Sequence, residues 1–282
     1  YGKFSFSRLC ADAGVCDDFA EPAESILTKA FSKLVAVDSR RWIKFLTDIL
    51  PRFSCELAAS LSDFEKRMLQ MFYITVFQET ADWRSHTAQA NMQLLADSPI
   101  MMHELYALLA LNLERIDFID QPVPLGFDCP LDLHCTYTRD QILIAMDYMT
   151  PKNVREGVKW LPDKQVDVFF ITLNKADKDY SPTTMYNDYS INESLFHWQS
   201  QSTTSDTAST GQRYINHRQR GSRVVLFVRE FKQDSIGAAP YTCLGTAAYV
   251  KHTGSRPMNI TWHLDQPIPA KYLRKTNKLV VG

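Results

Sequence analysis

The sequence predicts an α+β protein in which an N-terminal all-α helical domain precedes a mainly β domain, built as a curved sheet or a small barrel. Three observations predict this class: helical spacing of apolar residues up to about residue 115, a proline-rich stretch after it, and short β-branched and aromatic runs beyond residue 150. The chain has 282 residues, 45% of them hydrophobic and 22% charged, so it is able to bury a core.

The helical half is indicated by apolar periodicity. In the segment 25–35, apolar residues at 26, 27, 31, 34 and 35 recur at helical spacing. Further helices are expected at 39–49, 61–78, 83–96 and 98–116, and Pro51 and Pro99 fall near helix boundaries, where a missing N–H is tolerated. We therefore expect a helical linker domain at residues 1–118.

The second half begins after a connector at residues 119–134, which carries prolines and a glycine in place of periodic residues. One more helix is expected at 138–148, because Thr138 can cap it. Beyond it, β-branched and aromatic runs predict strands, and these runs lie at 166–173, 223–231, 241–250 and 258–264. Residues 135–282 are therefore expected to form the mainly β domain.

Charge divides the chain at nearly the same place. Residues 1–135 hold 12 Lys and Arg against 19 Asp and Glu, whereas residues 136–282 hold 19 against 13. The overall net charge of −1 therefore hides an acidic first half and a basic second half. A basic surface is what an anionic partner such as nucleic acid requires.

Several function classes lack sequence support. The chain has no G-x-x-x-x-G-K-[ST], G-x-G-x-x-G, H-E-x-x-H or G-x-S-x-G motif, so we expect no catalytic residues and no cofactor on this chain. No apolar run reaches the length of a membrane helix, and no signal segment is evident, which favours a cytoplasmic protein. Because the sequence starts at Tyr1 without an initiator Met, we expect a piece of something longer.

The six cysteines follow no C-x-x-C or zinc-finger spacing. We interpret them as reduced cytosolic thiols and expect no bound metal. The alternative is a metal site made by Cys129, His134 and Cys135, which are close in sequence but lack an evident fourth ligand.

The most informative segment is 181–211. Four aromatic residues, Tyr186, Tyr189, Phe196 and Trp198, alternate there with small polar residues and one carboxylate, Asp188. Aromatic faces with a few polar groups suit a flat heterocycle, and a carboxylate accepts a hydrogen bond from the exocyclic amine of cytosine. The alternative interpretation is that the aromatics fill a β core and that Asp188 caps a turn.

A Ser/Thr-rich stretch and a cluster of cations follow this segment. Residues 200–211 are too polar for a core strand and predict a surface loop. The cations after it are candidate contacts to the DNA backbone, and they are Arg213, His217, Arg218, Arg220 and Arg223. Alternatively, they belong to a solvated hairpin end.

Longer motifs carry a family resemblance over about 134–270. They are Tyr137-Thr-Arg, Arg155-Glu-Gly-Val, Phe170-Ile-Thr-Leu-Asn-Lys, Ser181-Pro-Thr-Thr-Met-Tyr-Asn-Asp-Tyr, Leu195-Phe-His-Trp-Gln-Ser-Gln-Ser, Leu226-Phe-Val-Arg-Glu and Pro257-Met-Asn-Ile-Thr-Trp. This region resembles the domain of unknown function at the C-terminus of bacterial DEAD/DEAH-type helicases. The arrangement is similar to that of type IV, modification-dependent restriction endonucleases, in which a phospholipase-D-like nuclease precedes the helicase.

The resemblance implies a fold like the SET- and RING-associated (SRA) domain, a curved barrel that flips a modified cytosine between two aromatic rings. Carried over, Tyr186 with Tyr189 or Trp198 would stack on the base, and Asp188 would accept from its amine. Gln199 or Ser200 would lie near the ring edge. Phe196 is an alternative second ring, and the direction of His197 is left open.

From this resemblance we expect a target-recognition module for double-stranded DNA that carries 5-methylcytosine or 5-hydroxymethylcytosine, acting in phage defence in the bacterial cytoplasm. The upstream helicase and nuclease domains of the same polypeptide would be its partners, and ATP and Mg would serve those domains. Two rival hypotheses stay open: an autonomous nuclease or glycosylase on modified DNA, and a protein-interaction platform that docks on the helicase core.

Overall fold

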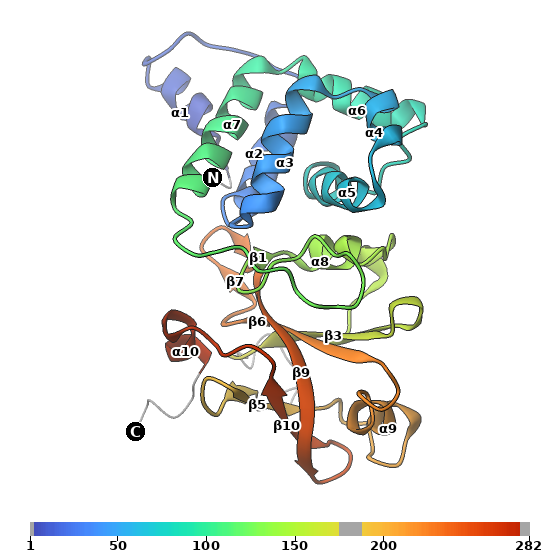
Figure 1. Ribbon diagram of the computed structural model, residues 1–282. Coiled ribbons are helices and arrows are strands. Elements are labelled where there is room, and N and C mark those ends of the chain that lie inside the picture. Colours follow the sequence, from blue (N-terminus) through green and yellow to red (C-terminus); the bar gives the residue numbers. More distant parts are fainter. Residues whose placement is uncertain (1–2, 175–187, 277–282) are drawn as a thin grey trace. The chain divides into compact units, whose positions relative to one another are not determined.

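The computed structural model describes residues 3–174 and 188–276, with side chains up to residue 273 (Figure 1). Within these residues the chain forms two compact units. The helical unit comprises residues 3–122, 128–153 and 235–240, and the sheet unit comprises 123–127, 154–234 and 241–276, apart from the gap. The predicted boundary differs from this division, because residues 128–153 belong to the helical unit.

The predicted helices are confirmed. The helical unit contains α1 (Phe6–Asp12), α2 (Glu24–Leu34), α3 (Arg40–Ile49), η1 (Leu50–Arg52), α4 (Cys55–Ser60), α5 (Asp63–Phe77), α6 (His86–Ala96), α7 (Pro99–Glu114), β1 (Thr136–Tyr137), α8 (Arg139–Ala145), η2 (Pro151–Asn153) and β8 (Gly237–Ala238). Serine side chains cap several of them: Ser39 accepts from the N–H of Trp42, and Ser62 forms a capping box with Glu65.

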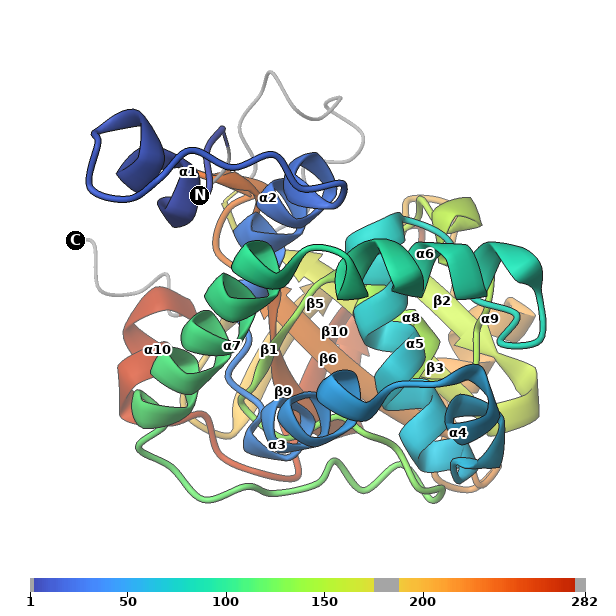
Figure 2. The ribbon, with the colours of Figure 1, turned by 90° about the horizontal axis from the view of Figure 1, so that it is seen from above.

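The core of the helical unit lies where α2, α3, α5 and α7 pack against one another (Figure 2). Trp42 is fully buried, and its indole N–H donates to the backbone carbonyl of Met68 at 2.9 Å. Helix α8 packs against α5, and the Gln141 amide donates to the Thr75 hydroxyl at 2.9 Å. These contacts explain why α8 belongs to the helical unit although the sequence places it after the connector.

The sheet unit contains β2 (Val158–Leu161), η3 (Pro162–Lys164), β3 (Val166–Thr172), β4 (Tyr189–Ser190), β5 (Leu195–Gln199), α9 (Ser209–Ile215), β6 (Arg223–Arg229), β7 (Gln233–Asp234), β9 (Tyr241–Thr253), β10 (Asn259–Leu264) and α10 (Ala270–Thr276). Strands at all four predicted positions are confirmed. Strands β2, β4 and β5 and helix α9 were not predicted from the sequence.

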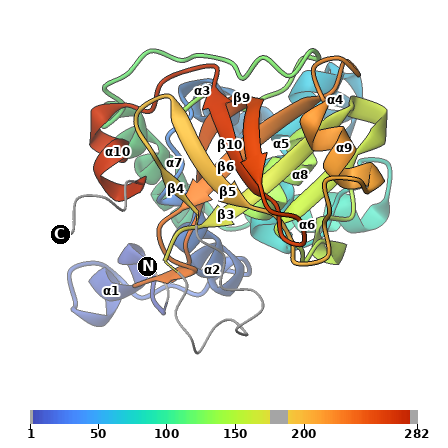
Figure 3. The same cartoon turned by 90° about the horizontal axis from the view of Figure 1, so that it is seen from below.

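The strand order is β2-β3-β6-β9-β10-β5-β4, with one parallel pair, β3 and β6, among antiparallel neighbours. Figure 3 shows β9, β10 and β5 side by side, with β4 beyond β5. Register shifts in β6–β9 and β9–β10 bend the strands locally. This path ends at β2 and β4, so the described sheet is open, and the closed small barrel is not observed.

The core of the sheet unit lies against one face of this sheet. Strand β3 is buried along its whole length. The core cluster joins Phe169 with Phe196, Trp198 and Trp262 from β5 and β10, and Tyr214 of α9 packs on the same face. Helix α9 therefore covers the strands that carry the predicted pocket residues.

No single helix among the described residues is long and apolar enough to cross a membrane. In the described part of the chain, only α6 and α7 taken together reach the required length and hydropathy, and they are bent by 84° at their junction.

Candidate nucleic-acid interface

Strand β5 divides the predicted base-binding residues between two faces of the sheet. Phe196 and Trp198 are buried, whereas Leu195, His197 and Gln199 are partly exposed, so burial alternates residue by residue. Alternation of this kind follows from strand geometry, since successive side chains point to opposite faces. The structure therefore separates the predicted site residues into a core-facing set and an outward-facing set.

The core-facing rings are packed against other aromatics. The Trp198 and Phe169 ring centroids lie 4.2 Å apart at an interplanar angle of 32°, and Tyr214 meets Trp198 edge-on at 5.6 Å. Phe196 is fully buried. Phe196 and Trp198 therefore both belong to the hydrophobic core, as the alternative interpretation expected, and Trp198 keeps only 5% of its surface exposed.

Asp188 lies beside Trp198. The pairing of Tyr189 with His197 in antiparallel β4 and β5 places Asp188 opposite Trp198, and opposite residues share a face. The Asp188 carboxylate accepts a hydrogen bond from the backbone N–H of Gln199 at 2.9 Å and is only 2% exposed. The structure thus brings together the predicted carboxylate and one predicted ring.

The outward face carries a second aromatic pair. Tyr189 and His197 stack with ring centroids 4.8 Å apart and an interplanar angle of 15°. The ladder continues from His197 to Thr261 and then to Lys251, which is exposed. This row of two stacked rings, a hydroxyl and a cation lies across four adjacent strands.

The remaining pocket candidates serve local structure or lie elsewhere. The Gln199 side-chain amide donates to the Asn259 side-chain oxygen at 3.1 Å. Ser200 is fully buried; its hydroxyl accepts from the N–H of Met258 at 2.9 Å, and its own N–H donates to the Met258 carbonyl. Tyr186 lies outside the described residues.

The Ser/Thr-rich stretch differs from the expected surface loop. Thr204 and Ser205 are buried, and α9 begins within the stretch at Ser209. A Cβ atom at Gly211 would lie 2.0 Å from the Ser205 carbonyl oxygen, so this close approach of two backbone segments requires glycine. The stretch is therefore folded tightly against the turn before β10, where the N–H of Arg256 donates to the Thr204 carbonyl.

Two of the predicted backbone contacts are engaged within the fold: Arg213 is partly buried and His217 is buried. The Arg213 guanidinium donates to both carboxylate oxygens of Asp167, at 2.7 and 2.9 Å, and lies 4.4 Å from the Trp160 ring centroid. His217 is 3% exposed; its Nε2 accepts from the N–H of Tyr249 at 3.1 Å, and its Nδ1 lies 3.3 Å from the Ser222 carbonyl. Both side chains therefore hold the fold together, and burial lowers the pKa of His217.

The other three cations lie nearer the surface. Arg218 is exposed and donates to the Asp265 carboxylate at 2.7 Å, and Arg220 is exposed. Arg223 is partly exposed, and its guanidinium lies so close to Gly126 that a Cβ atom there would clash with it. These three arginines lie within six consecutive residues and are the predicted cations that keep exposed surface.

Sequence reasoning missed the carboxylate that pairs with Arg213. Asp167 is fully buried in β3, and burial raises its pKa while the Arg213 guanidinium opposes that shift. The available signal was the single acid within the apolar run Val166-Asp-Val-Phe-Phe. A charge in such a strand requires a partner, and Arg213 supplies it.

The alternative metal site is not assembled. The Cys129 thiol donates to the Ala145 carbonyl, and the Cys135 thiol donates to the Asp38 carbonyl. Across residues 3–174 and 188–276, no group of three His, Cys, Asp or Glu side chains has metal-binding geometry.

The comparison with family models gives a match. A family model described as a domain of unknown function, DUF3427, matches residues 131–275, just over half of the chain. No curated protein matches the sequence.

Proposed function

The chain belongs to the DUF3427 family, and we propose that it is the DNA-recognition module of a helicase-containing, modification-dependent restriction endonuclease. In this proposal the sheet unit binds double-stranded DNA and receives one flipped 5-methylcytosine or 5-hydroxymethylcytosine. The helicase and nuclease domains of the same polypeptide supply ATP hydrolysis and strand cleavage, with ATP and Mg. Residues of this chain recognise the target and do not cut it.

The observation that carries the proposal is the buried Asp188 carboxylate beside Trp198. Its hydrogen bond from the Gln199 N–H holds the carboxylate in one orientation. Cytosine offers an amine donor where thymine has a carbonyl oxygen, so a fixed carboxylate accepts from cytosine and repels thymine. Burial strengthens this selectivity, because an unpaired polar contact is costly away from water.

The aromatic surroundings supply the other part of base recognition. Stacking on an aromatic side chain contributes about 1 to 3 kcal/mol per base. Extruding a base costs a few kcal/mol, so one ring and two or three hydrogen bonds to the base edge are needed to offset it. Trp198 shares a sheet face with Asp188, but its ring already packs against Phe169 and Tyr214, so stacking of a base on Trp198 requires the displacement of one of these rings.

The modification itself contributes a small transfer free energy. Burying one methyl carbon is worth about 0.8 kcal/mol, which corresponds to about fourfold in affinity. Direct discrimination between methylated and unmethylated cytosine should therefore be modest in the isolated module. Larger selectivity in the complete enzyme would arise from coupling to the helicase and nuclease steps.

Phosphate contacts are assigned to Arg218, Arg220 and Arg223. Arginine suits this role because its planar guanidinium donates two hydrogen bonds to a phosphate. The basic composition of residues 136–282 supports the same assignment.

The test is a fluorescence-anisotropy titration of the purified chain with two duplexes that differ only in one cytosine methyl group, at about 50 and 150 mM salt. We expect tighter binding to the methylated duplex at both salt concentrations, by a factor of about four. Equal affinity for the two duplexes would overturn methyl recognition. Strand scission or base release by this chain alone, with Mg present, would instead favour an autonomous nuclease or glycosylase.

A further inference from the structure

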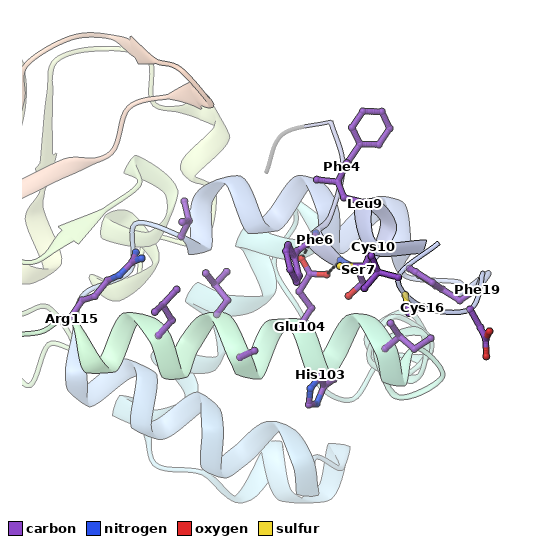
Figure 4. Close-up of a pocket in the computed structure, with 17 residues that line it drawn as sticks. Phe4, Phe6, Ser7, Leu9, Cys10, Cys16, Phe19, His103, Glu104 and Arg115 are labelled. Carbon is purple, nitrogen blue, oxygen red and sulfur yellow. Dashed lines mark hydrogen bonds between the residues drawn. The ribbon is translucent and has the colours of Figure 1, made fainter. Parts of the chain in front are cut away.

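A large apolar groove lies in the helical unit, between the N-terminal segment around α1 and helix α7 (Figure 4). Its volume is about 930 Å³. Phe6 and Leu9 line it from α1, Leu108 and Leu111 line it from α7, and Val35 follows α2. The base-recognition residues all lie in the sheet unit, so this groove is a separate feature.

Exposed apolar side chains are concentrated in this groove. Eleven large hydrophobic side chains among the described residues are exposed, and six of them line it. These six are Phe4, Phe6, Leu9, Val15, Ile100 and Leu111, each at least 40% exposed. Contiguous exposed apolar surface of this kind marks a binding site on a folded protein.

Helix α7 presents a regular stripe along the groove. Ile100, His103, Ala107 and Leu111 are exposed at spacings of three, four and four residues, which places them on one face. The stripe from Ile100 to Leu111 spans about 17 Å of this helix, which is the length of a partner helix of about three turns. The small side chain of Ala107 at its centre permits close approach of another backbone.

The opposite wall is held by polar contacts. Helix α1 has no buried residue, yet the buried Glu104 carboxylate accepts from the N–H groups of Phe6 and Ser7, at 2.7 and 2.8 Å. Arg8 donates to Glu24 at 2.7 Å and lies over the Phe19 ring. Figure 4 shows Phe6 and Ser7 next to Glu104. These contacts hold α1 in position before any partner binds, and the apolar side chains of α1 remain exposed.

The two ends of the groove carry charges of opposite sign. At the beginning of α7, Glu21 accepts from the N–H groups of Ile100 and Met101, and the nearby Asp17 lines the groove. Asp12 and Asp18 in the same segment are exposed and share Arg8 with Glu24 as their counter-ion, so three carboxylates face one guanidinium and the segment keeps a net negative charge. At the far end of α7, the lining residue is the exposed Arg115.

We propose that this groove binds an amphipathic helix of a partner protein. The helix has apolar anchors at i, i+3 or i+4, i+7 and i+11, as in other helix-in-groove complexes. Its Lys or Arg residues lie over Asp12, Asp17 and Asp18, and its Asp or Glu residues lie at Arg115. Because basic residues favour a helix C-terminus and acidic residues an N-terminus, the bound helix runs antiparallel to α7.

The test uses the full chain and three designed, fluorescently labelled peptides of about 16 residues. The first has a leucine stripe, Glu in its first turn and Lys in its last turn. The second keeps the stripe but has Glu in both end turns, and the third is a scrambled version of the first. We expect the first peptide to bind at least tenfold more tightly than the second, and the scrambled peptide not to bind.

Two matched variants locate the binding. Ala107→Lys places a long charged side chain in the groove and should abolish binding of the first peptide. Ala110→Lys makes the same change at an exposed position of α7 outside the groove and should preserve it. Asp17→Lys should lower the affinity for the first peptide, and it should reduce the difference in affinity between the first and the second peptide.

Three results would overturn the proposal. Equal peptide binding by the Ala107→Lys variant and the wild type would place the site elsewhere. A concentration-dependent dimer in sedimentation, abolished by Ala107→Lys and accompanied by no peptide binding, would assign the groove to a second copy. Binding to phosphatidylcholine and phosphatidylglycerol vesicles with the same sensitivity, again without peptide binding, would assign it to a lipid surface.

Discussion

The guanidinium of Arg213 in α9 forms a two-point ion pair with the fully buried carboxylate of Asp167 in β3, 46 residues away in sequence. Trp160 covers the guanidinium through a cation–π contact. The pair therefore ties α9 to strand β3, and α9 in turn carries Tyr214 onto Trp198. Arg213, which was predicted to contact DNA, is therefore a structural residue, and its removal should lower the stability of the fold.

We expect Arg213→Ala to lower the free energy of unfolding by about 3 to 5 kcal/mol, because it leaves a buried carboxylate without its cation. Urea unfolding followed by circular dichroism measures this. The matched substitution Arg220→Ala removes an exposed arginine and should change stability by less than about 0.5 kcal/mol. A loss below 1 kcal/mol for Arg213→Ala would show that the ion pair is dispensable.

Arg220→Ala should instead weaken DNA binding. We expect a loss of about fivefold, equally for methylated and unmethylated duplexes, because an exposed charge contact contributes up to about 1 kcal/mol. The slope of log affinity against log salt should fall by about 0.9 for each phosphate contact removed. Anisotropy titrations at several salt concentrations provide both values, and an unchanged slope would remove Arg220 from the interface.

His217 predicts a pH dependence of stability. Burial lowers its pKa below the ordinary value of 6.5, so the unfolded chain binds a proton at a pH where the folded chain does not. Stability is therefore complete above about pH 6.5 and is lost as the pH falls below it. Urea unfolding between pH 7.5 and 5 should show this loss, by up to about 1.4 kcal/mol per pH unit.

The substitution His217→Gln should flatten that pH dependence, whereas His263→Gln, at an exposed position of β10, should preserve it. Identical pH profiles for His217→Gln and the wild type would show that another group is responsible.

Cysteine reactivity should follow burial. Cys16 is exposed, whereas burial raises the pKa of the Cys129 thiol to about 12 and keeps it protonated at neutral pH. We expect a thiol-specific disulfide reagent to label Cys16 rapidly in the native protein, and Cys129, Cys135 and Cys243 only after unfolding. Cys16→Ser should remove the fast phase. Rapid native labelling of Cys129, located by mass spectrometry, would contradict the buried placement.

The sequence predicted most helices and central strands, because their apolar periodicity is local. It did not predict that α8 packs with the helical unit, since the contacts responsible join Gln141 to Thr75 and Arg67 to Asp147, far apart in the chain. It also missed β5, whose neighbours β10 and β4 lie on either side of it, so that its alternating burial appears only once the sheet is formed.

The candidate site was predicted in part. The carboxylate Asp188 and the ring of Trp198 do lie together, because one strand register aligns them. The sequence could not assign Phe196 to the core or His197 to the opposite face, since both depend on which side of the sheet α9 covers. It likewise could not identify Arg213 and His217 as interior residues, because their partners Asp167 and Tyr249 are distant in sequence.

The outer face provides a control for the proposed pocket. His197→Ala removes the ring that stacks on Tyr189 but leaves Asp188 and Trp198 in place. We expect this variant to keep the preference for methylated DNA in the anisotropy titration. Loss of the preference would move the base-binding site to the outward face.

Base extrusion toward Asp188 is tested most directly with a duplex that carries 2-aminopurine next to a single 5-methylcytosine. Binding of the wild-type chain should raise 2-aminopurine fluorescence severalfold, because the neighbouring base has left the stack. Asp188→Asn keeps a carbonyl oxygen for the Gln199 N–H but loses the carboxylate, and it should abolish the increase. A wild-type complex that forms without any fluorescence change would contradict base flipping, and an undiminished signal from Asp188→Asn would contradict the role of Asp188.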